Sequence, residues 1–327
     1  MNSRLPFALL LLIALPLVAR AEPPSMAPAN TPHLTPQPAS ASSYAGKAPV
    51  LASARAGNRV VSVGDFGTVM LSDGGAFRQA REVPVNSTLN AVAFVDEKFG
   101  WAVGHWGVIL HTQDGGDTWT RQRIDTATDR PLFSVHFMDR NHGLAVGLWS
   151  LVLTTSDGGK TWENVILPKP PGGGRGDRNL FKVFGSNDGI LYIAAERGTV
   201  LRSADRGKTW TYLETGYKGS FWTGLVLHDG ALIVAGLRGT AYRSVDGGKS
   251  WSPATTNTKS SITDLVESGP ALFGVGLDGV ILKSTDGGNS FVARQRDDRL
   301  ALAAAVVAGD GSLLIFSKRG LVSAAER

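Results

Sequence analysis

One short phrase, Ser/Thr-x-Asp-Gly-Gly-x-Thr/Ser-Trp, recurs along the chain and restricts the possible folds more than any other feature. Close copies occupy residues 112–119, 155–162, 203–210, 244–251 and 284–291, and a shortened copy occupies residues 72–77. Their aspartates are 40 to 48 residues apart: Asp73, Asp114, Asp157, Asp205, Asp246 and Asp286. A period of this length is typical of repeated four-stranded units, so the sequence predicts one closed array of repeats.

A second repeated element precedes the phrase. Residues 63–69, 103–109 and 146–152 show it clearly, and further copies cover residues 194–200, 235–241, 275–281 and 316–322. Each copy reads as two apolar strands joined by a tight turn, whose glycine can take a positive φ. With one strand before this pair and one after the aspartate phrase, each unit has four antiparallel strands. The seven copies therefore predict an all-β, seven-bladed β-propeller.

The last unit ends at Arg327, shortly after its third strand. A missing fourth strand would leave an open edge on that blade, and open edges are normally paired or covered. We expect residues within 35–47 to supply the strand, so that pairing of N- and C-terminal strands closes the ring.

The N-terminal region is typical of an exported protein. Arg4 is followed by an apolar stretch at residues 5–18 and by Ala19-Arg20-Ala21, which predicts a signal peptide at residues 1–21. An uncleaved anchor is the alternative. Residues 22–45 are rich in Pro, Ala and Ser and are expected to form a tether, ahead of a propeller at residues 46–327. These features predict a periplasmic or secreted protein.

Composition excludes several kinds of chemistry. The chain has no cysteine, so disulfides, thiolate catalysis and cysteine-bound metal are ruled out. The six histidines form no spacing typical of a metal site, and no cofactor or metal is expected. A net charge of +5 is moderate for 327 residues and does not by itself indicate a nucleic acid partner. We expect no nucleic acid binding, and a monomer.

The aspartates of the repeated phrase are interpreted as structural. An aspartate in a tight turn can accept backbone N–H bonds, and identical carboxylates around a ring cannot all be active-site acids. The aromatic residue that ends the phrase is expected to pack in the core, as Trp119 and Trp210 would. Two turns are expected to be irregular, because Asp205 is followed by Arg206 and the first copy is one residue short.

The phrase resembles the Asp-box, or bacterial neuraminidase repeat. Residues 99–104, 107–112 and 142–147 are most similar to the photosystem II stability/assembly factor family. This resemblance implies a seven-bladed propeller without catalytic activity, which acts as an exported scaffold. It also implies binding to a membrane-protein complex or its assembling subunit. The location would be the thylakoid lumen in a photosynthetic organism, and another envelope complex would be the partner elsewhere.

A candidate partner-binding surface lies at the turns between the second and third strands. The residues that precede the turn glycines are Phe66, Trp106, Trp149, Arg197, Arg238, Asp278 and Arg319. Large aromatics are unexpected in such turns, and aromatics with arginine are common at binding surfaces. His105, Arg175 and Arg178 are added as contacts, the last two from a long loop at residues 168–179. The alternatives are aromatics that plug the mouth of the ring, and a loop that serves only as a spacer.

A glycosidase of the sialidase or xyloglucanase type is the alternative function. Arg197, Arg238 and Arg319, beside Glu196, could be compared with a sialidase site. However, none of these turns carries a tyrosine nucleophile, and the count of seven blades differs from the six of sialidases. Asp65, Asp278 and Glu196 are the only carboxylates in these turns that could form an acid pair. No catalytic residue is therefore assigned.

Overall fold

A computed structural model describes residues 37–173, 176–186 and 188–322. These residues belong to one compact unit that begins at Leu34. The predicted signal peptide, residues 1–21, and most of the predicted tether lie outside the described residues. The described part of the chain contains no helix with the length and apolar character needed to span a bilayer.

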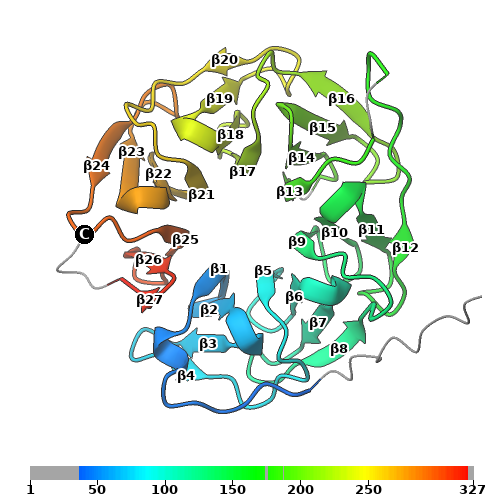
Figure 1. The fold of residues 1–327 in the computed structure, drawn as a ribbon, viewed down its shortest axis with the longest axis vertical. Coiled ribbons are helices and arrows are strands. Elements are labelled where there is room, and N and C mark those ends of the chain that lie inside the picture. The colour runs from blue at the N-terminus through cyan, green and yellow to red at the C-terminus, as the bar shows by residue number, and fades with distance from the viewer. Residues whose placement is uncertain (1–36, 174–175, 187, 323–327) are drawn as a thin grey trace, which may run out of the picture. The chain divides into compact units, whose positions relative to one another are not determined.

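Seven antiparallel sheets stand as blades around a central axis (Figure 1). The first three blades are β1 (Val50–Ala56), β2 (Arg59–Gly64), β3 (Val69–Ser72) and β4 (Arg78–Gln79); β5 (Leu89–Phe94), β6 (Gly100–Gly104), β7 (Ile109–Thr112) and β8 (Thr120–Arg123); and β9 (Leu132–Phe137), β10 (Gly143–Gly147), β11 (Val152–Thr155) and β12 (Glu163–Asn164). The fold prediction of a seven-bladed all-β propeller is confirmed.

The remaining blades follow the same order from the axis outwards. They are β13 (Leu180–Gly185), β14 (Leu191–Ala195), β15 (Thr199–Ser203) and β16 (Thr211–Glu214); β17 (Phe221–Val226), β18 (Leu232–Gly236), β19 (Ala241–Ser244) and β20 (Ser252–Pro253); β21 (Ile262–Ser268), β22 (Ala271–Gly276), β23 (Val280–Ser284) and β24 (Val292–Gln295); and β25 (Leu302–Val307), β26 (Leu313–Ser317) and β27 (Gly320–Leu321). The seventh blade thus has three strands among the described residues.

In five of the seven blades the second strand ends on a glycine, because two backbones meet there. A β-carbon on Gly104 would lie 2.0 Å from the carbonyl oxygen of Thr88, and Gly64 and Gly147 have the same restriction. Such an approach excludes every residue with a side chain. The glycine that ends the repeated Val-Gly pair therefore brings the second strand close to the start of the first.

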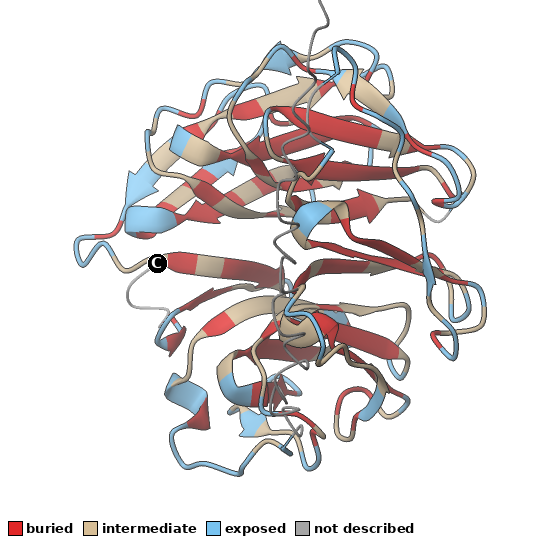
Figure 2. Ribbon diagram, turned by 45° about the vertical axis from the view of Figure 1, so that its right-hand side comes forward, coloured by how far each residue is buried: buried red, intermediate tan, exposed pale blue. Residues whose placement is uncertain are grey.

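The core consists of seven apolar clusters among the described residues, one at each interface between neighbouring blades. Buried residues run along both faces of the strands, whereas turns and loops are exposed (Figure 2). Trp119 and Trp210 are fully buried in two of these clusters, and Trp162 and Trp251 pack against two others. The aromatic of each phrase thus joins its blade to the preceding one.

Five of the six aspartate phrases form a hydrogen-bonded box between the third and fourth strands. In blade 2, Asp114 accepts bonds from the Thr112 hydroxyl (2.9 Å), the Thr118 amide (2.9 Å) and the Thr118 hydroxyl (2.7 Å). The indole of Trp119 donates to the carbonyl of Gly116 at 2.9 Å. Asp157, Asp205, Asp246 and Asp286 repeat this pattern of bonds.

The expected irregularity at Asp205 is wrong. Its turn has the same bonds as the others because Arg206 takes the left-handed conformation, with φ 61°, that glycine takes elsewhere.

The first copy of the phrase, at residues 72–77, does differ from the rest. Asp73 forms a salt bridge with Arg59 at 2.7 Å, and that arginine continues to Asp117 of blade 2 at 3.1 Å. The shortened turn is thereby linked to the next blade.

The expected closing strand also requires correction. Residues 37–44 form no strand, and Ala45–Lys47 form a 3-10 turn, η1, that lies against β27. Residues 39–42 are instead bonded to blade 1, where the Gln79 side chain donates to the Ser40 carbonyl at 3.0 Å and accepts from the Ser42 amide at 3.0 Å. The ring closes instead by packing between blades 7 and 1, where the rings of Phe77 and Phe316 meet edge to face at 5.8 Å.

Protonation of the box aspartates is expected to destabilise the fold in acid. Bonds from the Thr161 side chain and amide hold the pKa of Asp157 at about 2, below its ordinary 3.8. A carboxyl with a lowered pKa stabilises the folded state above its unfolded pKa and loses that contribution as the pH falls through about 2. The melting temperature of the wild-type protein should therefore fall between about pH 4 and pH 2.

Asp157→Asn should lower the melting temperature at neutral pH and make this acid-dependent fall shallower, because one contributing carboxylate is gone. Glu163→Gln is the matched control in the same blade, since Glu163 is exposed and its side chain makes no hydrogen bond among the described residues. Thermal unfolding followed by circular dichroism over the pH series measures both. Identical pH slopes for Asp157→Asn and wild type would contradict this role.

Candidate functional site

The two faces of the ring carry different loops. The turns between second and third strands contact the loops that join successive blades; for example, the Ser150 amide donates to the Arg178 carbonyl at 2.7 Å. We call this side the tip face. The aspartate phrases lie on the other side, the box face, where the Gly115 amide donates to Lys98 in the turn between the first two strands at 3.0 Å.

Five turns on the tip face are 3-10 turns: η2 (Asp65–Gly67), η3 (His105–Gly107), η4 (Leu148–Ser150), η5 (Leu237–Gly239) and η6 (Leu277–Gly279). The middle residue of each has a positive φ, as does Arg197 in blade 4. The values are 57° for Phe66, 58° for Trp106 and 52° for Trp149. This conformation costs L-residues about 1–2 kcal/mol and suits only Gly, Asn and Asp well.

Three consecutive blades thus place an aromatic where folding disfavours one. Phe66 is 74% exposed and Trp149 is 57% exposed, whereas Trp106 is half-buried. Each turn is fixed by its loop, since the Trp106 amide donates to Asp129 at 3.1 Å and the Trp149 amide donates to Asn179 at 3.3 Å. The predicted aromatic positions therefore lie on one face, although no ring contact joins these three side chains.

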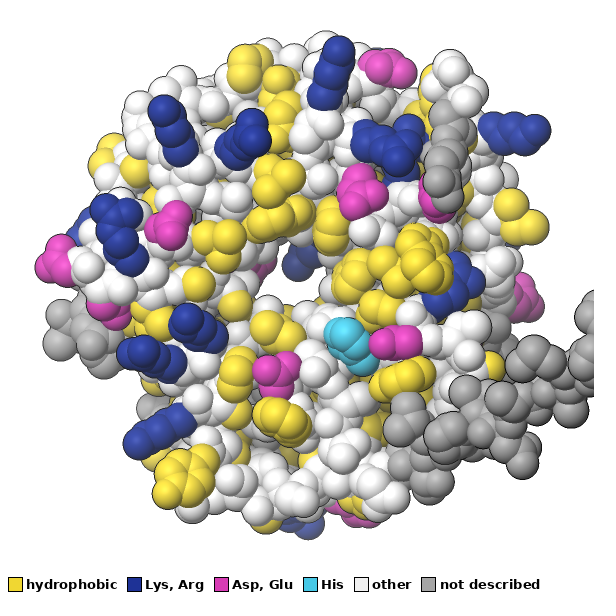
Figure 3. Space-filling view, in the orientation of Figure 1, with side chains coloured by type: hydrophobic (Ala, Val, Ile, Leu, Met, Phe, Trp, Pro, Cys, Tyr) yellow, Lys and Arg dark blue, Asp and Glu magenta, His cyan; other side chains and the backbone are white. Residues whose placement is uncertain are grey.

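The arginines of the predicted surface continue the same ring of turns. Arg197, Arg238 and Arg319 are exposed in blades 4, 5 and 7. Figure 3 views the molecule from the side of the 3-10 turns and shows Lys and Arg side chains spread between acidic ones, with hydrophobic side chains around the central opening. His105 is half-buried, with its Nδ1 atom 3.8 Å from Asp129. The tip face therefore offers separate cations and aromatics.

The carboxylates in these turns are bound to their own loops. Glu196 accepts bonds from the amide and side chain of Asn179, at 3.1 and 2.9 Å. Asp65 accepts from the Thr88 hydroxyl at 3.0 Å, and Asp278 accepts from the Ser260 hydroxyl at 3.1 Å. Within the described ranges, no three His, Asp or Glu side chains are placed to hold a metal ion.

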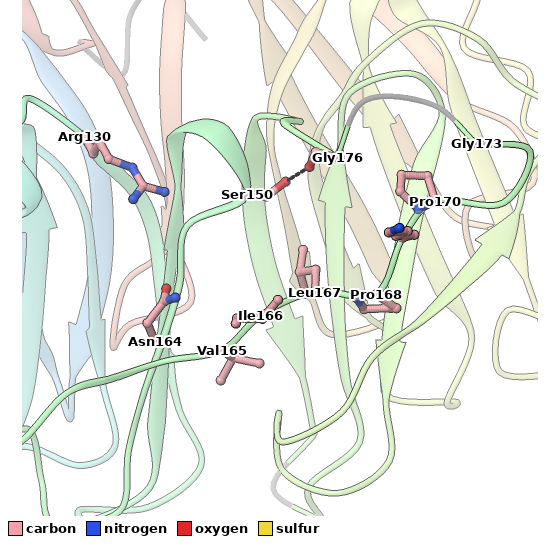
Figure 4. Close-up of a pocket in the computed structure, with 11 residues that line it drawn as sticks. Arg130, Ser150, Asn164, Val165, Ile166, Leu167, Pro168, Pro170, Gly173 and Gly176 are labelled. Atoms are coloured by element: carbon pink, nitrogen blue, oxygen red, sulfur yellow. Dashed lines mark hydrogen bonds between the residues drawn. The ribbon is translucent and has the colours of Figure 1, made fainter.

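The two arginines predicted as contacts in the long loop, Arg175 and Arg178, differ in what the structure shows of them. Arg175 lies outside the described residues. Arg178 is half-buried, and its guanidinium lies 5.4 Å from the centre of the Tyr212 ring rather than among the tip aromatics. The loop borders a hollow of about 580 Å³ beside Ser150. Figure 4 shows the Ser150 hydroxyl directed at the Gly176 carbonyl, which ties this loop to η4.

Sequence reasoning missed a ring of residues at the mouth of the central channel. The first strand of every blade has a register shift after its first residue, which leaves one residue unpaired, such as Asn90 between Leu89 and Ala91. In blades 3 to 5 the unpaired residues are Phe133, Phe181 and Trp222. The rings of the first two stack at 5.8 Å. Their common place in the repeat was visible in the sequence, but the bulge that turns them toward the channel was not.

Comparison with known proteins identifies relatives of this ring. A family model described as photosynthesis system II assembly factor YCF48 matches residues 75–265, more than half of the chain. Comparison with the curated proteins gives no match. A solved structure described as YCF48 bound to D1 peptide has a TM-score of 0.67 and 19% identity over 84% of this chain and 92% of that one. YCF48 from Cyanidioschyzon merolae has a TM-score of 0.66 and 15% identity over 84% and 94%.

Replacing a tip aromatic should stabilise the fold. Phe66→Asn puts a residue that tolerates the left-handed conformation at an exposed position, so stability should rise by up to about 1 kcal/mol. Val292→Asn is the control, because Val292 is 76% exposed in β24 and has no positive φ. Asparagine is disfavoured in a strand, so that variant should lose stability. Chemical denaturation of both variants measures the difference, and a clear loss of stability in Phe66→Asn would refute strain at this position.

Proposed function

This chain belongs to the photosynthesis system II assembly factor YCF48 family, and from that membership we propose that it is a non-catalytic assembly factor for a membrane-protein complex. The proposed partner is an exposed segment of an assembling subunit, in line with the solved relative that is described as bound to a D1 peptide. The protein is proposed to act as a monomer and to use its tip face. The observation that carries the proposal is the exposure of Phe66 and Trp149 in a disfavoured backbone conformation.

Strain of this kind supports a binding role because folding gives no reason for it. An aromatic at positive φ is retained where it serves a function, and such positions concentrate at binding sites. A face that carries both exposed aromatics and arginines also matches the composition of interaction hot spots. Arg197, Arg238 and Arg319 would pair with acidic or carbonyl groups of the partner, while Phe66, Trp106 and Trp149 would bury apolar side chains. His105, Arg175 and Arg178 are proposed as peripheral contacts.

The absence of catalysis is part of the proposal. Glycoside hydrolysis requires two carboxyl groups that face one substrate bond. Asp65, Glu196 and Asp278 are instead each hydrogen-bonded to a neighbouring loop, where they hold the turn in place. No specific observation favours the glycosidase alternative.

Binding of the partner should depend on both the aromatic residues and the arginines of the tip face. We expect Trp106→Ala/Trp149→Ala and Arg197→Ala/Arg238→Ala each to weaken co-purification with envelope or thylakoid membrane proteins by roughly tenfold or more, as hot-spot losses do. The controls lie on the box face. Val245→Ala removes an apolar side chain that is 69% exposed there, and Lys160→Ala/Lys249→Ala removes two exposed cations. Unchanged partners in both tip variants would overturn the site, and a loss in the controls would show that the effect is general.

Export is the second part of the proposal. We propose that residues 1–21 direct the chain to the periplasm, to the exterior, or to the thylakoid lumen of a photosynthetic organism, with cleavage after Ala21. The intact mass of the protein recovered from that compartment should equal that of residues 22–327. Recovery of the full-length mass would favour the uncleaved anchor instead.

A further inference from the structure

The central channel contains a small polar pocket that the proposed function does not use, and we call this pocket the seat. Its volume is about 120 Å³, and its wall is made by the innermost strands of the blades. Phe133, Phe181 and Trp222 are among the residues that line it. The volume of the seat limits any ligand to a small molecule.

Three polar side chains occupy the same level on three consecutive blades. Lys182, Thr223 and Asp264 each follow the unpaired residue of their strand, opposite Ala194, Ala235 and Val275 of the next strand. All three line the seat. On the other side of the ring the same register position holds two small residues, Ala52 and Ala91. The polar groups therefore form one arc, and the residues opposite leave space in front of it.

Among the described residues, the side chains of Lys182 and Thr223 have no hydrogen-bond partner, whereas Asp264 has one. The Thr223 side chain is 1% exposed, and its hydroxyl has no hydrogen bond within the described ranges, nor does the buried Ser53 hydroxyl. Lys182 has no ion pair there either, although it is near enough to Asp264 for their charges to interact. One oxygen of Asp264 accepts a bond from the Ala305 amide at 3.1 Å. Buried polar groups are rarely left unpaired, so such a group indicates bound water or a ligand.

The charges restrict the ligand further. Desolvation raises the pKa of Asp264, so this carboxylate gains from a cationic partner. His136 adds no charge at neutral pH, because burial and the charge of Lys182 lower its pKa to about 4. When Asp264 is ionised, the seat presents one cation and one anion, with the Thr223 hydroxyl on the blade between them. A ligand with only one charge would satisfy one of these groups and face the other with like charge.

We propose that this seat binds a small zwitterion, with its carboxylate toward Lys182, its ammonium toward Asp264 and a hydrogen bond to Thr223. A molecule the size of glycine or alanine matches the volume. The inference is independent of the partner that the tip face binds. Water that bridges the same three groups is the competing explanation, and the experiment below decides between them.

Calorimetric titration with glycine and L-alanine tests the proposal. Both should bind the wild-type protein, whereas acetate and methylammonium at the same concentrations should not. Lys182→Met and Asp264→Asn should each weaken binding by roughly tenfold or more, because each removes one charge-assisted contact. Lys218→Met is the control, since Lys218 is exposed and does not line the seat. Circular dichroism confirms that each variant is folded.

The outcomes separate the explanations. If neither zwitterion binds the wild-type protein, the channel holds only water and the proposal is overturned. Equal binding of acetate and glycine also overturns it, because Lys182 alone would then suffice. Should a single variant unfold, the exchanged pair Lys182→Asp with Asp264→Lys retains both charges and reverses their order. Binding of glycine to the exchanged pair supports the seat, and complete loss in a folded exchanged pair contradicts it.

Discussion

The structure depends on apolar packing between neighbouring blades. A four-stranded sheet has two apolar faces, and each can be buried only against another blade. Among the described residues every blade shares one cluster with each neighbour, and the ring is complete when blade 7 packs on blade 1. Contacts such as that between Phe77 and Phe316 therefore close the ring in this chain, in place of the expected N-terminal strand in blade 7.

The aspartate boxes give most of the blades the same packing against the preceding blade. Each box fixes the turn between two outer strands and directs an aromatic ring such as Trp119 into the interface with the preceding blade. Because these bonds lie on the box face, the turns of the opposite face are free to vary. The repeated aspartates thus have structural bonds, whereas residues on the tip face and in the channel differ from blade to blade.

Two sets of equivalent positions differ between the blades. At the tips, Phe66, Trp106 and Trp149 occupy a left-handed position in three blades and arginines occupy it in two others. In the channel, Lys182, Thr223 and Asp264 share one register where other blades have small residues. Both sets follow from one architecture, because a closed ring brings equivalent positions of distant repeats to the same height. Blades with the same backbone can therefore carry different side chains both on the tip face and in the channel.

The sequence by itself determined the repeat, the number of blades, the strand order and the tip residues. These follow from local patterns: alternating apolar strands, turn glycines and a box whose bonds join residues at most four positions apart. It did not determine how the ring closes, that Arg206 could replace a turn glycine, or that Arg178 would stack on Tyr212. It also did not show the channel seat. Lys182 and Asp264 are 82 positions apart in the chain, and only the curvature of the ring places them at one level. Such long-range proximity is decided by tertiary packing, for which the sequence of a single repeat contains no local signal.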